Sequence, residues 1–481
     1  MSAANENPRI IQGGMGVAVS SWRLASAVSR TGQLGVVSGS MLDTVMVRRL
    51  QDGDPGGHVR RAAEHFPIPG AADRIISRYY RPHGRPAGTP YQLLPMYRRW
   101  VSPPRQRVTM LANFVEVWLA KEGHAGPVGL NLLTKVQLPN LASLYGAMLA
   151  GVDYVIMGAG IPREIPAVLD AYAEHRPARL RFDVEGDKSE AAEYLELDPA
   201  EHWSPDKPLA RPRFLGVVSA ASLAATLSRK ATGVVDGFIV EGPTAGGHNA
   251  PPRGQMRMNE GGEPLYGDRD VVDLADMRDI GMPFWLAGGM GSPEALSYAR
   301  SEGAAGIQVG TLFAYADESG IDDPIKQGVL RAIRSGTVSL KTDPRASPTG
   351  FPFKVVSYSD VVGAPQPERE RNCDLGYLRV AARTPKGFVY RCAAEPVDAY
   401  VAKGGNPKDT VGRQCLCNGL TATIGLAQMR GEGVAEPPLI TSGDALLLLD
   451  RFLGGRTSYC ALDVLHYLLG TDCSMAFGTK D

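Results

Sequence analysis

Eight short apolar segments, most of which end at or beside a glycine, constrain the fold of this chain more than any other feature. Apolar residues continue along each segment without the polar alternation of a half-exposed strand, which is typical of parallel strands covered by helices. The intervening stretches 222–230, 270–281 and 292–303 have helical patterns and are long enough for crossover helices. The eight segments are residues 9–16, 34–39, 127–133, 153–160, 213–220, 236–242, 283–289 and 305–311.

Eight β/α units in succession predict a closed (β/α)₈ (TIM) barrel of the α/β class. The alternative is an open, doubly wound parallel sheet. Its first strand–helix turn normally carries a G-x-G-x-x-G fingerprint, and the sequence GGMGVAVS at 13–20 does not have that spacing. We therefore favour the barrel.

Two insertions and one extension interrupt the pattern. Residues 41–106 separate the second strand from its helix, and residues 186–212 precede the fifth strand. We assign residues 1–330 to the barrel and residues 331–481 to a mixed, partly helical C-terminal appendage. The appendage holds all six cysteines and two helical stretches, at 444–453 and 460–469.

The balance of charge excludes some partners. The chain has 51 basic and 51 acidic residues and no long run of like charge, which argues against nucleic acid as the main partner. No apolar run reads as a membrane span, and the polar residues 1–10 do not resemble a secretory signal. We expect a cytoplasmic protein whose cysteines are reduced. Its oligomeric state is open.

Glycines recur where the predicted strands end. In a barrel these ends form the face that carries the active site, and glycine lets backbone N–H groups approach a ligand closely. The loops at 287–295 and 309–313 follow strands seven and eight, the common phosphate site of this fold. Each glycine alone could simply make a tight turn, but Ser292 and Pro293 add a helix start beside the glycines, and we favour phosphate binding. The glycines in question are Gly13, Gly14, Gly39, Gly158, Gly246, Gly247, Gly288, Gly289 and Gly310.

His248 follows strand six on the same face. A histidine titrates near neutrality and suits proton transfer, although a lone loop histidine is more often structural. The sequence AGGH at 245–248 removes bulk beside it and leaves backbone donors there. We take His248 as the candidate catalytic residue and expect structural roles for His58, His65, His83, His124, His175, His202 and His466.

Six motifs together resemble the nitronate monooxygenases, formerly called 2-nitropropane dioxygenases. They are QGGMG, VGLNLL, YVIMGAGIP, EGPTAGGHNAP, LAGGMGSPEA and GAAGIQVGTLFAYADES, in that order between residues 9 and about 320. The same series is similar to the FMN-dependent enoyl-acyl-carrier-protein reductase II and to the related enoyl reductases of polyketide and polyunsaturated fatty acid synthesis. The resemblance implies FMN as the cofactor.

The resemblance also implies roles for single residues. Gly13, Gly14 and Met15 match the loop against the flavin ring, and Asn131 matches an asparagine that faces it. Ala245, Gly246 and Gly247 match the loop lining the cofactor, with the two glycines clearing space for the flavin. Gly288, Gly289, Gly310 and Thr311 match the FMN phosphate loops, and His248 matches the histidine that works beside the flavin.

The resemblance implies an FMN-dependent monooxygenase that oxidises alkyl nitronates with O₂ to a carbonyl compound and nitrite. The alternatives are an NAD(P)H-dependent enoyl reductase, whose substrate is an enoyl thioester on a carrier, and a flavin-binding barrel whose appendage mediates assembly. Pro243 and Thr244 depart from the family pattern, which has a hydrophobic residue and a glutamate there.

Two further features have two interpretations each. The arginines and aromatics of 76–100 could form a lid for an anionic substrate, but we favour a surface segment packed on the barrel rim. Cys373, Cys392, Cys415 and Cys417 could hold zinc or an iron–sulfur cluster, but C-x₂-C pairs are absent, and separate buried thiols fit better. We assign no metal site.

Overall fold

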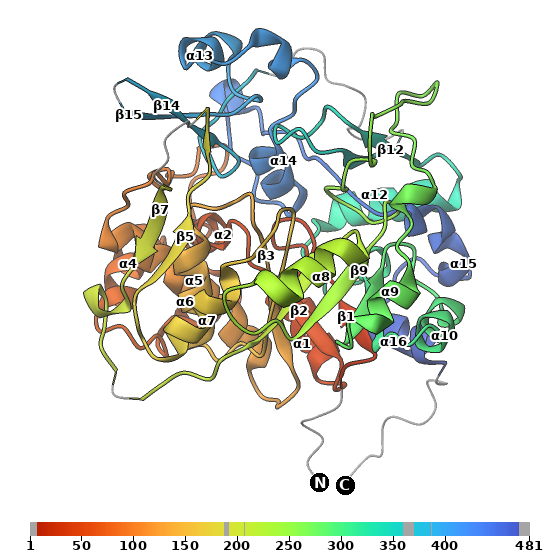
Figure 1. The fold of residues 1–481 in the computed structure, drawn as a ribbon. Coiled ribbons are helices and arrows are strands. Elements are labelled where there is room, and N and C mark those ends of the chain that lie inside the picture. The colour runs from red at the N-terminus through yellow and green to blue at the C-terminus, as the bar shows by residue number, and fades with distance from the viewer. Residues whose placement is uncertain (1–6, 187–191, 206, 359–369, 386, 471–481) are drawn as a thin grey trace, which may run out of the picture.

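The computed structural model describes residues 7–186, 192–205, 207–358, 370–385 and 387–470, and its centre is a closed barrel of eight parallel strands (Figure 1). The strand order around the barrel is β1-β11-β10-β9-β8-β4-β3-β2, so each strand pairs with its neighbours in the barrel sequence. The predicted (β/α)₈ fold is confirmed. The strands are β1 (Ile10–Gln12), β2 (Leu34–Ser38), β3 (Val128–Leu133), β4 (Tyr154–Gly158), β8 (Arg213–Val218), β9 (Gly237–Glu241), β10 (Phe284–Ala287) and β11 (Gly306–Val309).

The barrel is filled with side chains rather than hollow. Its interior holds one cluster of buried residues, which includes Ile11, Val36, Ile156, Ile239 and Trp285. The indole nitrogen of Trp285 donates a hydrogen bond of 2.7 Å to the carbonyl of Pro8. Side chains on the other face of each strand join the larger core beneath the helices. This filling leaves only the ends of the strands available for a site.

Helices cover the outside of the barrel, mostly where the sequence predicts them. Ser21 occupies the cap position of α1, but its hydroxyl does not cap the helix and instead donates to the carbonyl of Glu318 (3.3 Å). These outer helices are α1 (Trp22–Ser29), α5 (Pro103–Lys121), α6 (Asn140–Leu149), α7 (Ile165–Ala173), α8 (Ala221–Lys230), α9 (Leu274–Asp279) and α10 (Pro293–Ser301), with η4 (Asp268–Asp270) before α9.

The end of the chain supplies a further outer helix. β11 is followed by the short α11 (Thr311–Ala314) and by α12 (Asp323–Arg334), and the predicted boundary between residues 330 and 331 falls within α12. α16 (Ala461–Leu469) returns to pack against α1, α10 and α11. Figure 1 shows α16 at the lower edge of the barrel between α1 and α10. The last described helix therefore fills the gap in the ring.

The two insertions form local structure beside the barrel. The first contains α2 (Leu42–Gln51), η2 (Pro55–Gly57), α3 (His58–Ala63) and α4 (Ala71–Tyr79), which pack together and on α5. The second contains β7 (Tyr194–Leu197), which pairs antiparallel with the preceding β5 (Ala178–Arg181), and then η3 (Pro199–Glu201). β6 (Val184–Glu185) pairs in parallel with β14 of the C-terminal segment.

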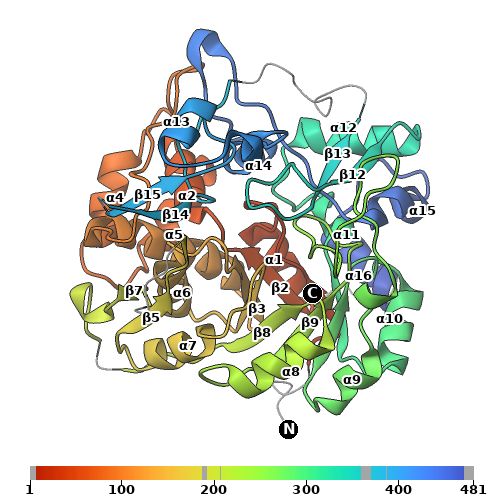
Figure 2. The same ribbon diagram turned by 45° about the horizontal axis from the view of Figure 1, so that its top comes forward.

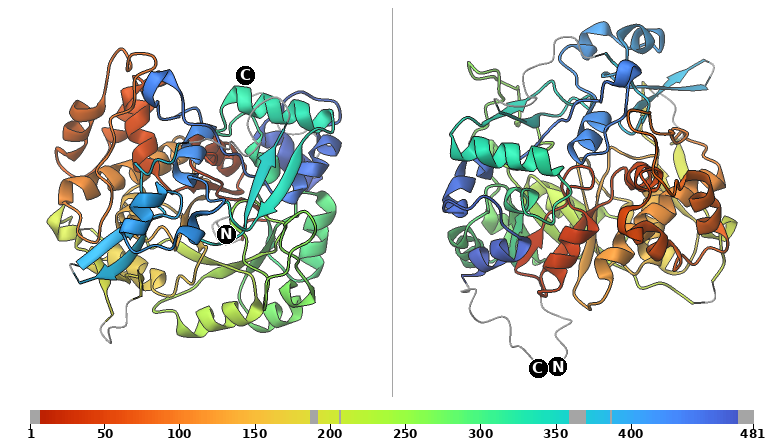
Figure 3. Two further views of the ribbon diagram at one scale, coloured as in Figure 1. Left: turned by 90° about the horizontal axis from the view of Figure 1, so that it is seen from above. Right: turned by 180° about the vertical axis from the view of Figure 1, so that it is seen from behind.

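The described residues between 335 and 470 form the C-terminal segment, part of which lies over the carboxyl ends of the barrel strands. Figure 2 and the view from above in Figure 3 show the hairpin β12–β13 and helix α14 crossing this end of the barrel. No helix in the described ranges has the length and apolar character needed to cross a membrane. The elements of this segment are β12 (Ser339–Asp343), β13 (Phe353–Ser357), β14 (Val380–Thr384), β15 (Gly387–Arg391), α13 (Val397–Ala402), η5 (Pro407–Thr410), α14 (Leu416–Thr423), η6 (Gly431–Gly433), η7 (Asp444–Leu448) and α15 (Leu449–Leu453).

Candidate active site

A cavity of about 250 Å³ lies between the carboxyl ends of the strands and the C-terminal segment. Its barrel side is formed by the loops after β1, β3, β9, β10 and β11, and its opposite side by residues between 377 and 445. All twelve residues proposed from the sequence line this one cavity. They are Gly13, Gly14, Met15, Asn131, Ala245, Gly246, Gly247, His248, Gly288, Gly289, Gly310 and Thr311.

Two glycines line the cavity where side chains of neighbouring strands leave little room for a Cβ. A Cβ on Gly14 would lie 2.3 Å from the Cβ of Asn131, and one on Gly13 would lie 3.1 Å from the Cγ of Gln308. The Oε1 of Gln308 is buried and lacks a hydrogen-bond partner in the described part of the chain. Because a buried acceptor is costly when unpaired, this oxygen fits a ligand N–H, such as the imide of a flavin ring.

Met15 lies beside these glycines and next to the loop after β11. Its backbone N–H donates to the hydroxyl of Ser20 (3.0 Å), which in turn donates to the carbonyl of Gly13 (2.9 Å). A Cβ on Gly310 would lie 3.4 Å from the sulfur of Met15. The Met15 side chain is thus supported by the loop after β11 while it lines the cavity.

The proposed phosphate loops have the expected backbone geometry. Gly288 and Gly289 have φ values of +85° and +68°, which favour glycine. Ser292 caps α10 by accepting a hydrogen bond from the backbone N–H of Ala295 (3.1 Å), and Pro293 is the first helical residue. The free N–H groups of such a helix start suit an anion. The residues present therefore fit FMN: this helix start would suit its phosphate, and the two glycines after β1 would leave room for its ring.

The C-terminal segment completes these loops, which the sequence did not predict. The hydroxyl of Thr311 accepts a hydrogen bond from the backbone N–H of Gly443 (3.1 Å), and the carbonyl of Thr244 accepts one from Asp444 (3.0 Å). The segment Thr441 to Asp444 is thereby fixed along one edge of the cavity.

The two glycines before His248 have different roles. A Cβ on Gly246 would lie 2.7 Å from the carbonyl carbon of Ser442, so this glycine makes room for the C-terminal segment. Gly246 also lines the cavity, and its clearing of space for a flavin stays a prediction. Gly247 has a φ of +75° and open space around its Cβ position, and its N–H donates to the hydroxyl of Thr441 (2.9 Å).

His248 lines the cavity and is held by residues of the β12–β13 hairpin. Its Nε2 lies 2.7 Å from the hydroxyl of Ser347, and its ring meets the ring of Phe353 edge-on at 4.9 Å. Burial lowers the pKa of His248 well below its usual value, and the nearby charge of Lys135 lowers it further. The imidazole is therefore neutral at pH 7 and able to accept a proton.

Two ionisable groups beside the cavity were not predicted. Burial lowers the pKa of Lys135 to about 7, and its ammonium lies 3.5 Å from the centre of the Phe351 ring. Glu241, the last residue of β9, lines the cavity, and burial raises the pKa of its carboxyl to about 7. The only sequence signal for Glu241 is a charge at the end of an apolar strand.

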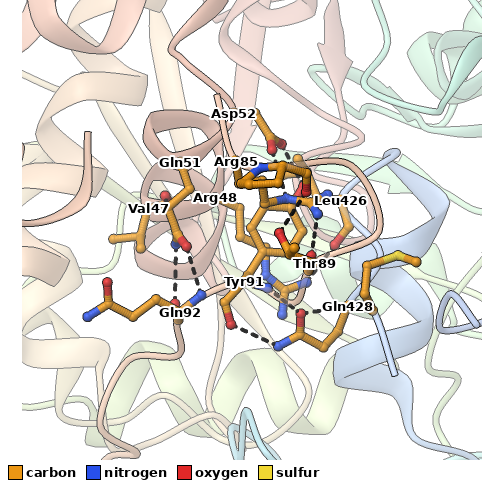
Figure 4. Close-up of polar contacts among 12 residues, drawn as sticks. Val47, Arg48, Gln51, Asp52, Arg85, Thr89, Tyr91, Gln92, Leu426 and Gln428 are labelled. Carbon is orange, nitrogen blue, oxygen red and sulfur yellow. Dashed lines mark hydrogen bonds and ion pairs between the residues drawn. The ribbon is translucent and has the colours of Figure 1, made fainter. Parts of the chain in front are cut away.

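Arg85 and Arg48 of the first insertion make contacts with other residues of the protein (Figure 4). Arg85 pairs with Asp52 at 3.0 Å and lies over the ring of Tyr91, whose hydroxyl donates to the same carboxylate. Arg48 donates to the carbonyl of Leu426 (2.5 Å). These contacts support the interpretation of the insertion as a segment packed on the barrel rim rather than a substrate lid.

The cysteines do not form a metal site in the part of the chain described. No group of three or more His, Cys, Asp or Glu side chains there is placed to hold a metal ion. The thiols of Cys373 and Cys392 contact each other, and Cys417 lines the cavity. Cys473 lies outside the described residues. None of the other seven histidines lines the cavity as far as the structure describes it.

Comparison with known proteins shows a family resemblance over part of the chain. Residues 205–343 match the family model for nitronate monooxygenase. The chain resembles the nitronate monooxygenases. This confirms the resemblance stated from the motifs and supports an enzyme of the nitronate monooxygenase-like oxidoreductase type. The match covers strands β8 to β11 and the β9 loop with His248.

Curated relatives of this nitronate monooxygenase-like chain fall into two kinds. A (3aS,4S,5R,7aS)-5-hydroxy-7a-methyl-1-oxo-octahydro-1H-indene-4-carboxyl-CoA dehydrogenase of Rhodococcus jostii is 30% identical over 37% of this chain and 44% of its own length. A probable nitronate monooxygenase of Staphylococcus haemolyticus is 31% identical over 22% of this chain and 28% of its own length. The chain thus spans less than half the length of either relative.

Two solved structures illustrate the proteins with a similar chain path. FabK from Thermotoga maritima has a TM-score of 0.46 and 16% identity, with 97% of this chain and 93% of that chain covered. The enoyl reductase domain of MlnA from Bacillus amyloliquefaciens has a TM-score of 0.47 and 13% identity, with 97% and 94% covered.

Proposed function

We propose that this protein is an FMN-dependent oxidoreductase that oxidises alkyl nitronates with O₂ to a carbonyl compound and nitrite. The observation that carries the proposal is the placement of His248 on the wall of a cavity whose remaining lining fits FMN. The match to the nitronate monooxygenase family model supports the same reaction class.

The residues of this chain would divide the work by position. Gly288, Gly289, Gly310 and Thr311 would hold the FMN phosphate, and Gln308 and Asn131 would contact the ring. Bound FMN supplies the electron transfer, which side chains cannot provide. His248, neutral at pH 7, would remove the α-proton of a neutral nitroalkane to give the nitronate. The C-terminal segment would exclude bulk water from the cavity.

A second candidate function is an NAD(P)H-dependent enoyl reductase. The similarity to a dehydrogenase named for a carboxyl-CoA substrate favours it, because that relative acts on a thioester. In this reaction the same cavity would hold FMN, and His248 would support hydride delivery rather than act as a base.

The flavin absorbance of FMN-loaded protein under anaerobic conditions separates the two. We expect propyl nitronate alone to bleach the oxidised flavin band, because the nitronate is itself the electron donor. Rapid bleaching by NADH or NADPH and none by nitronate would instead establish the reductase. Protein that retains no flavin would contradict the cofactor assignment itself.

A further inference from the structure

The contact between His248 and Ser347 joins the barrel to the loop that connects β12 and β13. The Nε2 of His248 lies 2.7 Å from the Oγ of Ser347, a residue with no exposed surface. We infer that Ser347 is a positioning residue that accepts a hydrogen bond from Nε2–H of His248 and so leaves Nδ1 as the unprotonated nitrogen. The inference rests on the proposed function, in which His248 is the base that removes a substrate proton.

The partners of the serine hydroxyl allow it to accept a hydrogen bond from the histidine, and the histidine's other nitrogen decides between the two possible directions. A hydroxyl donates one hydrogen bond and accepts two. The backbone N–H of Thr349 occupies one acceptor position of Ser347 Oγ (3.2 Å), and the Thr349 hydroxyl lies 2.8 Å away. If Ser347 donates to Thr349, its second acceptor position is free for Nε2–H of His248. All three contacts are then satisfied.

The other ring nitrogen indicates the same tautomer. No hydrogen bond to Nδ1 is found among the described residues, and His248 lines the cavity. A proton on Nδ1 would leave neither ring nitrogen free to accept a substrate proton, since Nε2 is held by Ser347. A bare Nδ1 facing the cavity is instead a base in position for a substrate proton.

The serine is itself held rigidly. Its carbonyl accepts a hydrogen bond from Arg413 (2.6 Å), and the carbonyl of the preceding Ala346 accepts one from Gln414 (2.9 Å). Backbone hydrogen bonds from Asn249 to Pro352 (2.9 Å) and from Lys354 to Gly247 (3.0 Å) pair the β9 loop with the hairpin on both sides of the histidine. A hydroxyl fixed in this way can hold the imidazole in one orientation.

The tautomer can be measured without any assay of activity. Full-length protein labelled with ¹⁵N-histidine is recorded at pH 7 in a two-bond ¹H–¹⁵N spectrum, and His248→Gln assigns the signals. We expect the wild type to show the Nε2–H tautomer and Ser347→Ala to show a mixture. Ser347→Thr, which keeps the hydroxyl, should retain the wild-type pattern. A wild-type Nδ1–H tautomer, or a spectrum unchanged by Ser347→Ala, would overturn the inference.

Kinetics then test the consequence for proton transfer. For Ser347→Ala we expect kcat with a neutral nitroalkane to fall about tenfold or more, toward the value for His248→Ala, because a positioned base contributes about 10²–10⁴-fold. With preformed nitronate the rate should change little, and flavin content should equal that of the wild type. The matched surface variant Ser335→Ala should match the wild type with both substrates.

The two proposals fail in different ways. An equal loss with both substrates would show a merely structural role for Ser347 and overturn the inference. If the wild type oxidises no nitronate, the proposed function fails, whereas the tautomer in the NMR spectrum still decides the role of Ser347.

Discussion

Glu241 places an ionisable carboxyl among the backbone groups that line the cavity. It ends β9 and pairs in register with Ala287, the residue before the proposed phosphate glycines. Burial raises its pKa from 4.5 to about 7, since the charged form loses hydration there. In the unfolded chain the carboxyl ionises at lower pH, so folding must work against this ionisation. The residue thus lowers stability at neutral pH and above.

We expect Glu241→Gln to stabilise the flavin-free protein at pH 8 by about 1–3 kcal/mol, since one pKa unit corresponds to about 1.4 kcal/mol. The sign follows from a pKa that is raised in the folded state. Below pH 4.5 the carboxyl is protonated in both states and the advantage vanishes, and it grows as the pH rises toward 7. Urea unfolding at several pH values measures this difference in the free energy of unfolding between variant and wild type. Glu196→Gln, at an exposed position on β7, is the control, and an equal effect of both variants would contradict the prediction.

Single residues were predictable where their neighbours in sequence reveal their setting. His248 stood out because AGGH follows a strand, and the glycines after β10 and β11 stood out because barrel strands end there. Ser347 and Gln308 carry no such local signal. Their significance comes from contacts across the fold, with His248 for the serine and with the Gly13 position for the glutamine.

At the scale of elements, the β9 loop and the segment Thr441 to Asp444 form one wall of the cavity. Three hydrogen bonds join this segment to barrel loops, from Gly247 to Thr441, from Gly443 to Thr311 and from Asp444 to Thr244. The close approach at Gly246 makes the contact possible, because a side chain there would meet backbone atoms of Ser442 and Gly443.

Gly246→Ala should therefore weaken this wall. Its Cβ would lie 2.7 Å from one backbone atom and 2.8 Å from another, so the segment must move. We expect the free energy of unfolding to fall by about 1–3 kcal/mol, the usual cost of forcing extra atoms into a packed site. FMN affinity, measured by quenching of flavin fluorescence, should fall as well. The control is Gly267→Ala, whose Cβ would meet nothing within 4 Å, and equal behaviour of the two variants would argue against the prediction.

The barrel elements were predictable because their signals are local. Each apolar segment contained a strand, and the helices at 222–230 and 292–303 correspond to α8 and α10. The C-terminal segment was less predictable. Its strands β12 to β15 are short and only partly buried, and β14 depends on pairing with β6, nearly 200 residues earlier in the chain. Local periodicity contains no information about such a contact.

At the scale of the whole molecule, the C-terminal segment contacts the barrel in two places. Near its middle it covers the carboxyl face and lines the cavity, and at its end α16 packs between α1 and α10. Buried Leu465 of α16 belongs to the same hydrophobic core as Leu24 of α1. Such a segment should not unfold independently, because separating it would expose the core of the barrel.

The distribution of two residue types allows this to be tested in the intact chain. All five tryptophans precede residue 331 and all six cysteines follow it. In urea, tryptophan fluorescence therefore reports the barrel, while pulsed thiol labelling of buried Cys392, Cys415 and Cys417 reports the C-terminal segment. We expect both probes to give one transition with the same midpoint, as cooperative unfolding requires.

Substitution in α16 sharpens the test. Leu465→Ala removes a side chain that is 1% exposed. We expect it to lower the free energy of unfolding by about 2–5 kcal/mol and so to move the urea midpoints of both probes down together. The matched Leu448→Ala removes a leucine that is 70% exposed and should change neither midpoint noticeably. If thiol labelling shifts while tryptophan fluorescence does not, the C-terminal segment unfolds as a domain of its own. The cavity would then lie between two domains, and its closure over a cofactor would depend on their docking rather than on the stability of the barrel.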